Sequence, residues 1–201
     1  MSNKTNTELK SYYELVDKFA AAGADEDISN GKPEHAVYLI SKLFDIAKTK
    51  VRLYSDHLAH YVEKDNGKKV DLYGQCDVIR HIKKFLQIPG NELSIVVEND
   101  VENIQEHPLF KALDELNEKK KILGTCEIRK VDDKAIAWLK ENEFLNHFMV
   151  TDDSASRVEL DDQPSSYAAI ANFGNKSKSE RLVRLFDNLH WKYASPIKIW
   201  G

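Results

Sequence analysis

The sequence predicts an α/β protein with a mixed, largely parallel sheet and helices on both faces. Short apolar runs bounded by turn residues alternate along the chain with amphipathic stretches long enough to form helices. With 42% hydrophobic and 31% charged residues among 201, the composition suits one domain with a sizeable core. Strands that are separated by helical crossovers pair in parallel and carry helices on the sheet faces.

Residues 1–30 predict an N-terminal helical arm. Apolar residues recur at helical spacing between Leu9 and Phe19, Thr7 is a suitable N-cap, and the polar stretch 24–33 reads as a linker. We expect this helix to lie against the main body, and the alternative is an arm that clasps a partner subunit. The main α/β domain is then residues 31–201.

The main domain opens with a helix from Pro33 to Ala47 and a strand from Val51 to Asp56. An excursion with a turn at Asn66 and Gly67 follows, which predicts a hairpin. The remaining pattern predicts a helix over 77–87, a strand over 93–99, a helix from Pro108, a strand over 125–131, a short helix or turn over 135–142 and a final helix over 178–193.

Charge and composition exclude several classes of protein. The net charge of −4 gives no overall attraction to nucleic acid, so any such contact has to come from a local patch. Cys76 and Cys126 lie far apart in sequence, which favours reduced thiols and a cytoplasmic location. No apolar run reaches the length of a membrane span, and no Gly-rich phosphate loop, CxxC pair or HExxH motif occurs. The pattern therefore gives no support to a nucleotide loop, a zinc ribbon or a zincin site.

The segment from 143 to 184 contains the candidate site. The segment predicts strand, turn, strand, loop, strand and helix, with apolar runs at 144–150 and 167–173 bounded by turn-rich polar residues. His147 lies in the first run, Asp152 and Asp153 follow its end, and Asn172 lies near the end of the second. A histidine, an acid and an asparagine at neighbouring strand ends predict a polar pocket.

This order resembles one half of the phospholipase D superfamily. The family motif is a strand with H-x-K, an Asp a few residues on, and G-S-x-N on a later strand before a helix. The matching segments here are His147–Met149, the Asp152–Asp153 pair and Ala169–Gly174, within a resemblance that covers roughly residues 33 to 193. It implies a phospholipase D-like fold, a catalytic set of His147, Asn172 and Asp153, and phosphodiester chemistry that needs no metal or other cofactor.

Two departures from the motif argue against catalysis. Met149 stands at the position of the motif lysine and Ile170 at that of the serine. A phosphoryl transition state depends on cations and donors around its oxygens, and Met149 supplies neither the charge nor the three donors of lysine. One lost oxyanion donor costs about 10²–10³ in rate. We therefore expect a degenerate motif. The alternative is that His147 is an ordinary strand histidine and Asn172 a turn residue.

A basic stretch opens the final helix and predicts a ligand-binding patch. Its cations are Lys176, Lys178, Arg181 and Arg184. Amides at a helix N-terminus bind phosphate, and these cations would add to the field. The alternative is a solvated helix face.

The resemblance implies a non-catalytic module that binds a phosphodiester ligand, above all nucleic acid, or a partner protein. One alternative is an active, metal-independent nuclease or phosphodiesterase that works as a homodimer through His147. Another is a structural subunit of a larger assembly. Family members with one motif per chain bring two chains together, so a homodimer is expected.

Overall fold

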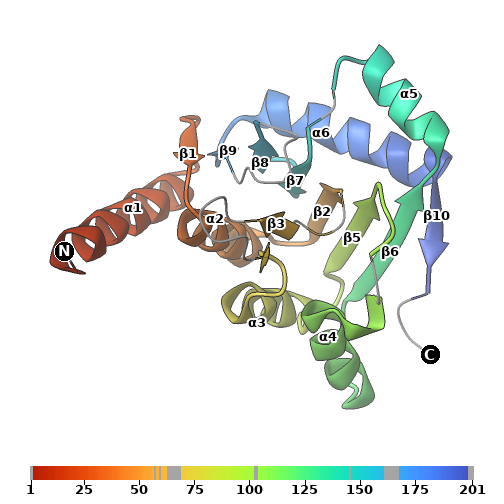
Figure 1. The fold of residues 1–201 in the computed structure, drawn as a ribbon, viewed down its shortest axis with the longest axis horizontal. Helices are drawn as coiled ribbons and strands as arrows, with labels where there is room; N and C mark the ends of the chain where they lie inside the picture. Colours follow the sequence, from red (N-terminus) through yellow and green to blue (C-terminus); the bar gives the residue numbers. More distant parts are fainter. Residues whose placement is uncertain are drawn as a thin grey trace.

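A computed structural model describes residues 2–56, 58, 60–62, 69–101, 104–144, 146–160 and 168–198. Within these residues an eight-stranded mixed sheet forms the centre of the molecule, and helices cover both of its faces (Figure 1). The strand order is β1-β9-β8-β7-β2-β5-β6-β10.

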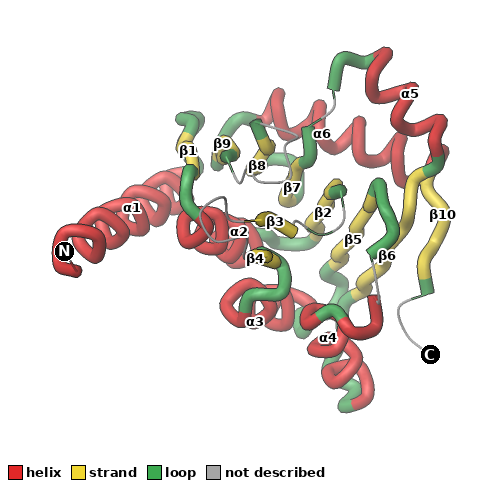
Figure 2. Tube along the Cα trace, viewed as in Figure 1, coloured by secondary structure: helices red, strands yellow, loops and turns green. Residues whose placement is uncertain are grey.

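The predicted helices and strands occur in the predicted order, and two further strands were not predicted: Ile28–Asn30, inside the predicted linker 24–33, and Ala194–Ile197. The first half contains α1 (Ser2–Ala22), β1 (Ile28–Asn30), α2 (Pro33–Ile46), β2 (Lys50–Ser55), β3 (His60–Val62), β4 (Lys69–Asp71), α3 (Cys76–Leu86) and β5 (Glu92–Val97). The second half contains a 3-10 turn (Ile104–Glu106), α4 (Pro108–Glu118), β6 (Thr125–Val131), α5 (Asp133–Glu141), β7 (Phe148–Thr151), β8 (Ala155–Glu159), β9 (Ala169–Asn172), α6 (Lys176–Asn188), a π-helical turn (Leu189–Tyr193) and β10 (Ala194–Ile197). Strands β3 and β4 pair as the expected hairpin, and its predicted turn at Asn66 and Gly67 lies outside the described residues. This hairpin lies between β2 and α3 in the view of Figure 2.

The sheet is mixed, as predicted, but parallel pairs are its minority. Strand β5 pairs in parallel with β2 and with β6, and the crossovers contain α3 and α4. All other pairings among the described strands of this sheet are antiparallel. Antiparallel pairs outnumber the predicted parallel ones because the meander β7–β8–β9 extends the sheet beside β2 and because β10 pairs antiparallel with β6.

Two apolar cores lie on opposite faces of the sheet. Val51 and Leu53 point toward α2, α3 and α4, whereas Tyr54 points toward α5 and α6. This division follows from the alternation of side chains along an extended strand. The site described below lies at the end of the sheet where β2 and β5 finish.

The predicted arm joins the same sheet. Strand β1 pairs with β9, and the Tyr12 hydroxyl of α1 donates to the carbonyl of Ser29 at 3.1 Å. The first turns of α1 extend away from the body in Figure 1. Among the described residues, no helix combines the length and apolar character that a bilayer crossing requires.

Candidate functional site

His147 lies directly before β7, at the carboxyl ends of the parallel strands. Strand β7 runs antiparallel to β2 and places Phe148 opposite Tyr54, near the end of β2. The carbonyl of His147 accepts a hydrogen bond of 2.9 Å from the amide of Glu159. His147, which was predicted inside the strand, thus lies one residue before it, at the edge of the sheet where sites in α/β proteins usually occur.

Two carboxylates flank the His147 ring. Its Nε2 lies 3.3 Å from Oε1 of Glu98, and its Nδ1 lies 3.5 Å from Oε2 of Glu159. The first contact has the distance of an ion pair but not the direction of a hydrogen bond. The Tyr54 hydroxyl donates to the same Glu98 oxygen, and its ring meets the imidazole edge-on with centroids 5.4 Å apart.

These contacts hold His147 in its charged form. Burial alone would lower the pKa of His147, but Glu159 and Glu98 outweigh burial and raise the pKa to about 9. Burial would raise the pKa of Glu159, but His147 and Arg157 lower that pKa to about 2. A doubly protonated imidazole has no free lone pair, so it is neither a nucleophile nor a general base.

A buried arginine extends the network toward β1. Arg157 is only 1% exposed and donates to Oε1 of Glu159 at 2.9 Å. Its Nε also donates to Oδ1 of Asn30 at 3.4 Å. Sequence reasoning missed Glu98, Arg157 and Glu159. The signal in the sequence that could have revealed two of them is the pair of charged residues, Arg157 and Glu159, at alternate positions of a strand whose pattern is otherwise that of a buried strand.

Asn172 lies at the opposite end of the strands from His147. Glu159, beside His147, pairs with Ala169, whereas Asn172 pairs with Ser156. That offset of three residues corresponds to about 10 Å along the strands. The expected pocket of histidine, acid and asparagine is therefore not formed, because the chain reverses twice between the two residues.

Asn172 instead organises the turn that leads into α6. Its Oδ1 accepts the amides of Gly174 and Asn175 at 3.0 and 2.7 Å. Its Nδ2 donates to Asp25 and Asp27 at 3.1 and 3.0 Å. All four contacts tie the end of β9 to neighbouring backbone and to the segment before β1, which is the role of a turn residue.

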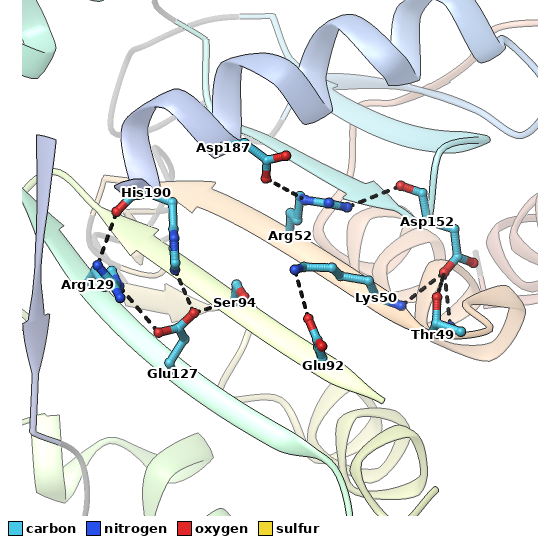
Figure 3. A network of polar contacts seen from close by, with 10 residues as sticks. All are labelled: Thr49, Lys50, Arg52, Glu92, Ser94, Glu127, Arg129, Asp152, Asp187 and His190. Carbon is cyan, nitrogen blue, oxygen red and sulfur yellow. Dashed lines mark hydrogen bonds and ion pairs between the residues drawn. The ribbon is translucent and has the colours of Figure 1, made fainter. Parts of the chain in front are cut away.

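Asp152 acts as a clamp at the tip of the β7–β8 turn. Its carboxylate accepts the amides of residues 48–50 at 2.9–3.0 Å and the Thr49 hydroxyl at 2.9 Å. Figure 3 shows the bonds from Thr49 and Lys50. Burial would raise the pKa of Asp152, but these bonds lower it. The residue itself has φ of +50°, a region in which Asp is enriched.

The remaining motif positions are not directed toward His147 as a catalytic set. Asp153, the predicted motif acid, is exposed on the same turn as Asp152. Met149 is 1% exposed and packs in the core on the α2 side of the sheet, while Ile170 pairs with Val158 on β8. The structure thus distributes the predicted catalytic residues over both ends of the strands.

At the basic start of α6, an amide that could bind an anion is already hydrogen-bonded within the protein. Asn175 caps the helix by accepting the Lys178 amide at 2.9 Å, and Lys178 Nζ lies 3.9 Å from Asp27. Arg184 lies 4.0 Å from Glu180, and the Arg181 guanidinium lies 5.9 Å from the centre of the Phe144 ring. Lys176, Arg181 and Arg184 are exposed, and we refer to these three as the basic face of α6. An anion would meet these side chains rather than free helix amides.

A second polar network joins α6 to the sheet (Figure 3). Arg52 of β2 donates to Asp187 of α6 at 3.1 Å and to the carbonyl of Asp152 at 3.3 Å. Farther along, His190 Nε2 lies 2.6 Å from Oε1 of Glu127 on β6. Because the cation of Arg52 already has an acidic partner, this network holds the layers together and offers little charge to a ligand.

Comparison with known proteins supports the fold. No protein-family model and no curated protein matches the sequence. The solved structures that match include TrmBL2, an archaeal chromatin protein whose structure shows a novel mode of DNA binding, with a TM-score of 0.53 and 14% identity over 96% of this chain. The present chain spans 65% of that protein's chain, just under two thirds.

Two further matches cover nearly the whole of the other protein. Nuc from Salmonella typhimurium, a phospholipase D family member, has a TM-score of 0.52 and 12% identity over 86% of this chain and 98% of its own. NucT from Helicobacter pylori has a TM-score of 0.52 and 9% identity over 85% and 98%. The chain therefore has a phospholipase D-like fold, as the sequence resemblance predicted.

Proposed function

We propose that this chain is a non-catalytic phospholipase D-like module that binds nucleic acid through the basic face of α6. The proposal that the module is non-catalytic rests on the position of His147 between two carboxylates. An imidazolium held in this way lacks the lone pair with which a histidine attacks phosphorus.

The charge around His147 supports the same conclusion. Glu98 and Glu159 place two negative charges where a phosphodiester would need cations, and Arg157 is buried and directed toward Glu159. Phosphoryl transfer is accelerated by positive charge and donors around the phosphate oxygens. Here the nearest carboxylates would repel the substrate instead.

The basic face of α6 is the proposed contact with nucleic acid. It presents three exposed cations beside two acids, Glu180 and the half-exposed Asp187, whose charge Arg52 already pairs, and so forms a small local positive patch on a chain of net charge −4. Lys178, at its border near Asp27, contributes less. So small a patch neutralises few phosphates, which predicts modest affinity and a shallow dependence on salt. The DNA-binding description of TrmBL2, a protein of similar fold, favours nucleic acid over a partner protein.

Fluorescence anisotropy with labelled single- and double-stranded oligonucleotides tests the binding. The double variant Lys176→Glu with Arg181→Glu should lose at least tenfold in affinity. A matched control is Lys134→Glu with Lys140→Glu, which makes the same change in net charge on exposed positions of α5. Equal affinity of wild type and the α6 variant would overturn the proposed contact.

A second assay tests the absence of catalysis. Wild type is incubated in EDTA with DNA, RNA and bis(p-nitrophenyl) phosphate, and no turnover is expected. Turnover that disappears in His147→Ala would establish the alternative, a metal-independent phosphodiesterase.

We also propose a homodimer and a cytoplasmic location. The first rests on one motif per chain in a family whose site uses two. The second rests on Cys76 and Cys126, which are both free thiols.

A further inference from the structure

An exposed tryptophan lies where α6 ends. Trp191 is 69% exposed and belongs to the π-helical turn Leu189–Tyr193 that continues α6. It is the most exposed large apolar side chain in the described part of the chain. A single exposed apolar residue is common on protein surfaces, so exposure by itself assigns no role. The contacts of the ring and its position on the helix provide the further evidence.

Arg129 of β6 lies against the indole ring of Trp191 and is itself held in place. Its guanidinium is 5.1 Å from the ring centre. The same group donates to Glu127 at 3.3 Å and to the carbonyls of His190 and Ala194 at 3.2 and 3.4 Å. Figure 3 shows the bonds to Glu127 and His190. A cation over an aromatic face is favourable, so the sheet supports the ring from beneath.

Most of the indole surface remains open to solvent. The imidazole of His190 stands nearly perpendicular to the ring, with centroids 4.4 Å apart and planes 82° apart. His190 is 3% exposed, and its Nε2 is held 2.6 Å from Glu127. With these neighbours in place Trp191 is still 69% exposed, so a planar group can stack on the indole without displacing a protein side chain.

Trp191 extends the basic face of α6. Arg184 and Trp191 are seven residues apart, about two helical turns, and both are exposed, so they lie on the same side of α6 and its π-helical extension. At about 1.5 Å per residue, roughly 10 Å of helix separates them. Lys192, next in the chain, is also exposed. This side of the helix therefore presents cations together with one aromatic ring.

Two acids border this side of the helix, and each has a cationic partner. Asp187 lies 3.1 Å from Arg52, and Glu180 lies 4.0 Å from Arg184. The side chains of Glu180 and Arg184 are both more than half exposed, and such a surface pair contributes little. Arg184 can therefore exchange Glu180 for a phosphate at little cost.

We infer that Trp191 stacks a base of single-stranded nucleic acid whose phosphates lie along the basic face of α6. Proteins that hold single strands without sequence preference combine cations along the backbone with aromatic rings on which bases stack. Inside a duplex the neighbouring base pairs already cover the faces of each base, which leaves the ring nothing to stack on. The inference rests on the proposed function and narrows its ligand from nucleic acid to single strands.

Fluorescence anisotropy with labelled oligothymidylate, oligouridylate and a DNA duplex of the same length tests it. Trp191→Ala should lose about tenfold in affinity for at least one of the two single strands, the effect of one lost base stack, and should bind the duplex as wild type does. Trp191→Phe, which retains a flat ring, should keep most of the affinity. Trp191→Leu, which retains only apolar bulk, should resemble Trp191→Ala. Thermal unfolding verifies that each variant is folded.

A strand of abasic residues separates stacking from charge, because it has the same phosphates and no bases. Wild type and Trp191→Ala should bind it equally. Leu123→Ala, which removes a 55% exposed side chain from the loop before β6, is the matched control and should bind every strand as wild type does.

Equal affinity of wild type and Trp191→Ala for both single strands would overturn this inference and leave the basic face of α6 as the proposed contact. A tenfold loss that also affects the duplex and the abasic strand would overturn the assignment to base stacking. If wild type bound no strand and no duplex, the proposed function itself would fail, and the inference with it.

Discussion

Glu159 contacts His147 through both its backbone and its side chain. Its amide donates to the His147 carbonyl at 2.9 Å, while its carboxylate lies 3.5 Å from Nδ1 of the ring. The first contact continues the pairing of β7 with β8, so the strand register itself delivers the acid to the imidazole. The charge state of His147 is thus a consequence of how the hairpin is paired.

The ring of His147 should titrate far above the ordinary range. NMR of its ring carbons should give a pKa near 9, against 6.5 for an unperturbed histidine. Because the folded value exceeds the unfolded value, this stabilisation is complete below pH 6.5 and is lost as the pH rises through 9. His147→Gln should remove most of that pH dependence from denaturant unfolding between pH 6.5 and 9. A measured pKa close to 6.5 would contradict the clamped imidazolium.

Loss of the Glu159 charge should be costly. Glu159→Gln removes a carboxylate that faces both His147 and the buried Arg157. Breaking a buried ion pair from one side destabilises by about 3–5 kcal/mol, and we expect a loss near the lower value in urea unfolding. Glu180→Gln, at an exposed pair with Arg184, should change stability by less than about 0.5 kcal/mol. Similar effects of the two substitutions would show that the Glu159 contacts are weak.

The clamp at Asp152 should also be measurable. Asp152→Ala removes the acceptor of three amides and one hydroxyl, and hydrogen bonds to a charged group are worth about 1.5–3 kcal/mol. We expect a loss of about 2 kcal/mol, whereas Asp153→Ala on the same exposed turn should be nearly neutral. Since the pKa of Asp152 is lowered from 3.8, its contribution is present above that pH and declines as the pH falls below it. Unfolding curves at pH 7 and pH 3 for wild type and Asp152→Ala should therefore converge at the lower pH.

Light scattering over a dilution series tests the proposed homodimer. The expected mass is twice the chain mass of 23.1 kDa, because the resemblance to the phospholipase D superfamily implies that a chain with one motif pairs with a second copy. A monomer at every concentration would remove the shared-site model and leave the fold unaffected.

The sequence predicted the elements far better than the site. Helices such as α2 and α3 show strong apolar periodicity, and most strands are bounded by turn residues, so the limits of these predicted elements agree with the structure to within a few residues, whereas the short edge strands β1 and β10 were not predicted. Periodicity is a local property, and it does not state which strands become neighbours. The partners of His147 come from the end of β5 and the end of β8, and nothing near position 147 in sequence indicates Glu98.

The position of Asn172 shows the same limit. The predicted pocket required the strand that contains Asn172 to finish at the end of the sheet where His147 lies. The three predicted strands are present as β7, β8 and β9, and the two antiparallel pairings make the last strand run in the same direction as the first and finish at the far end. The end of the sheet at which Asn172 lies depends on the strand register and on how many times the chain changes direction. Both are set by which strands pair in the folded protein.

The central place of β2 has a consequence for synthesis of the chain. Its parallel partner β5 follows soon after it, but its other neighbour, β7, pairs Thr151 with Val51, 100 residues later. At about 5–20 residues per second, translation leaves the second edge of β2 unpaired for roughly 5–20 s. An unpaired apolar strand edge is a template for association between chains. Nascent chains that stall before β7 would thus be the species most prone to aggregate, and chaperone contact is most valuable in that interval.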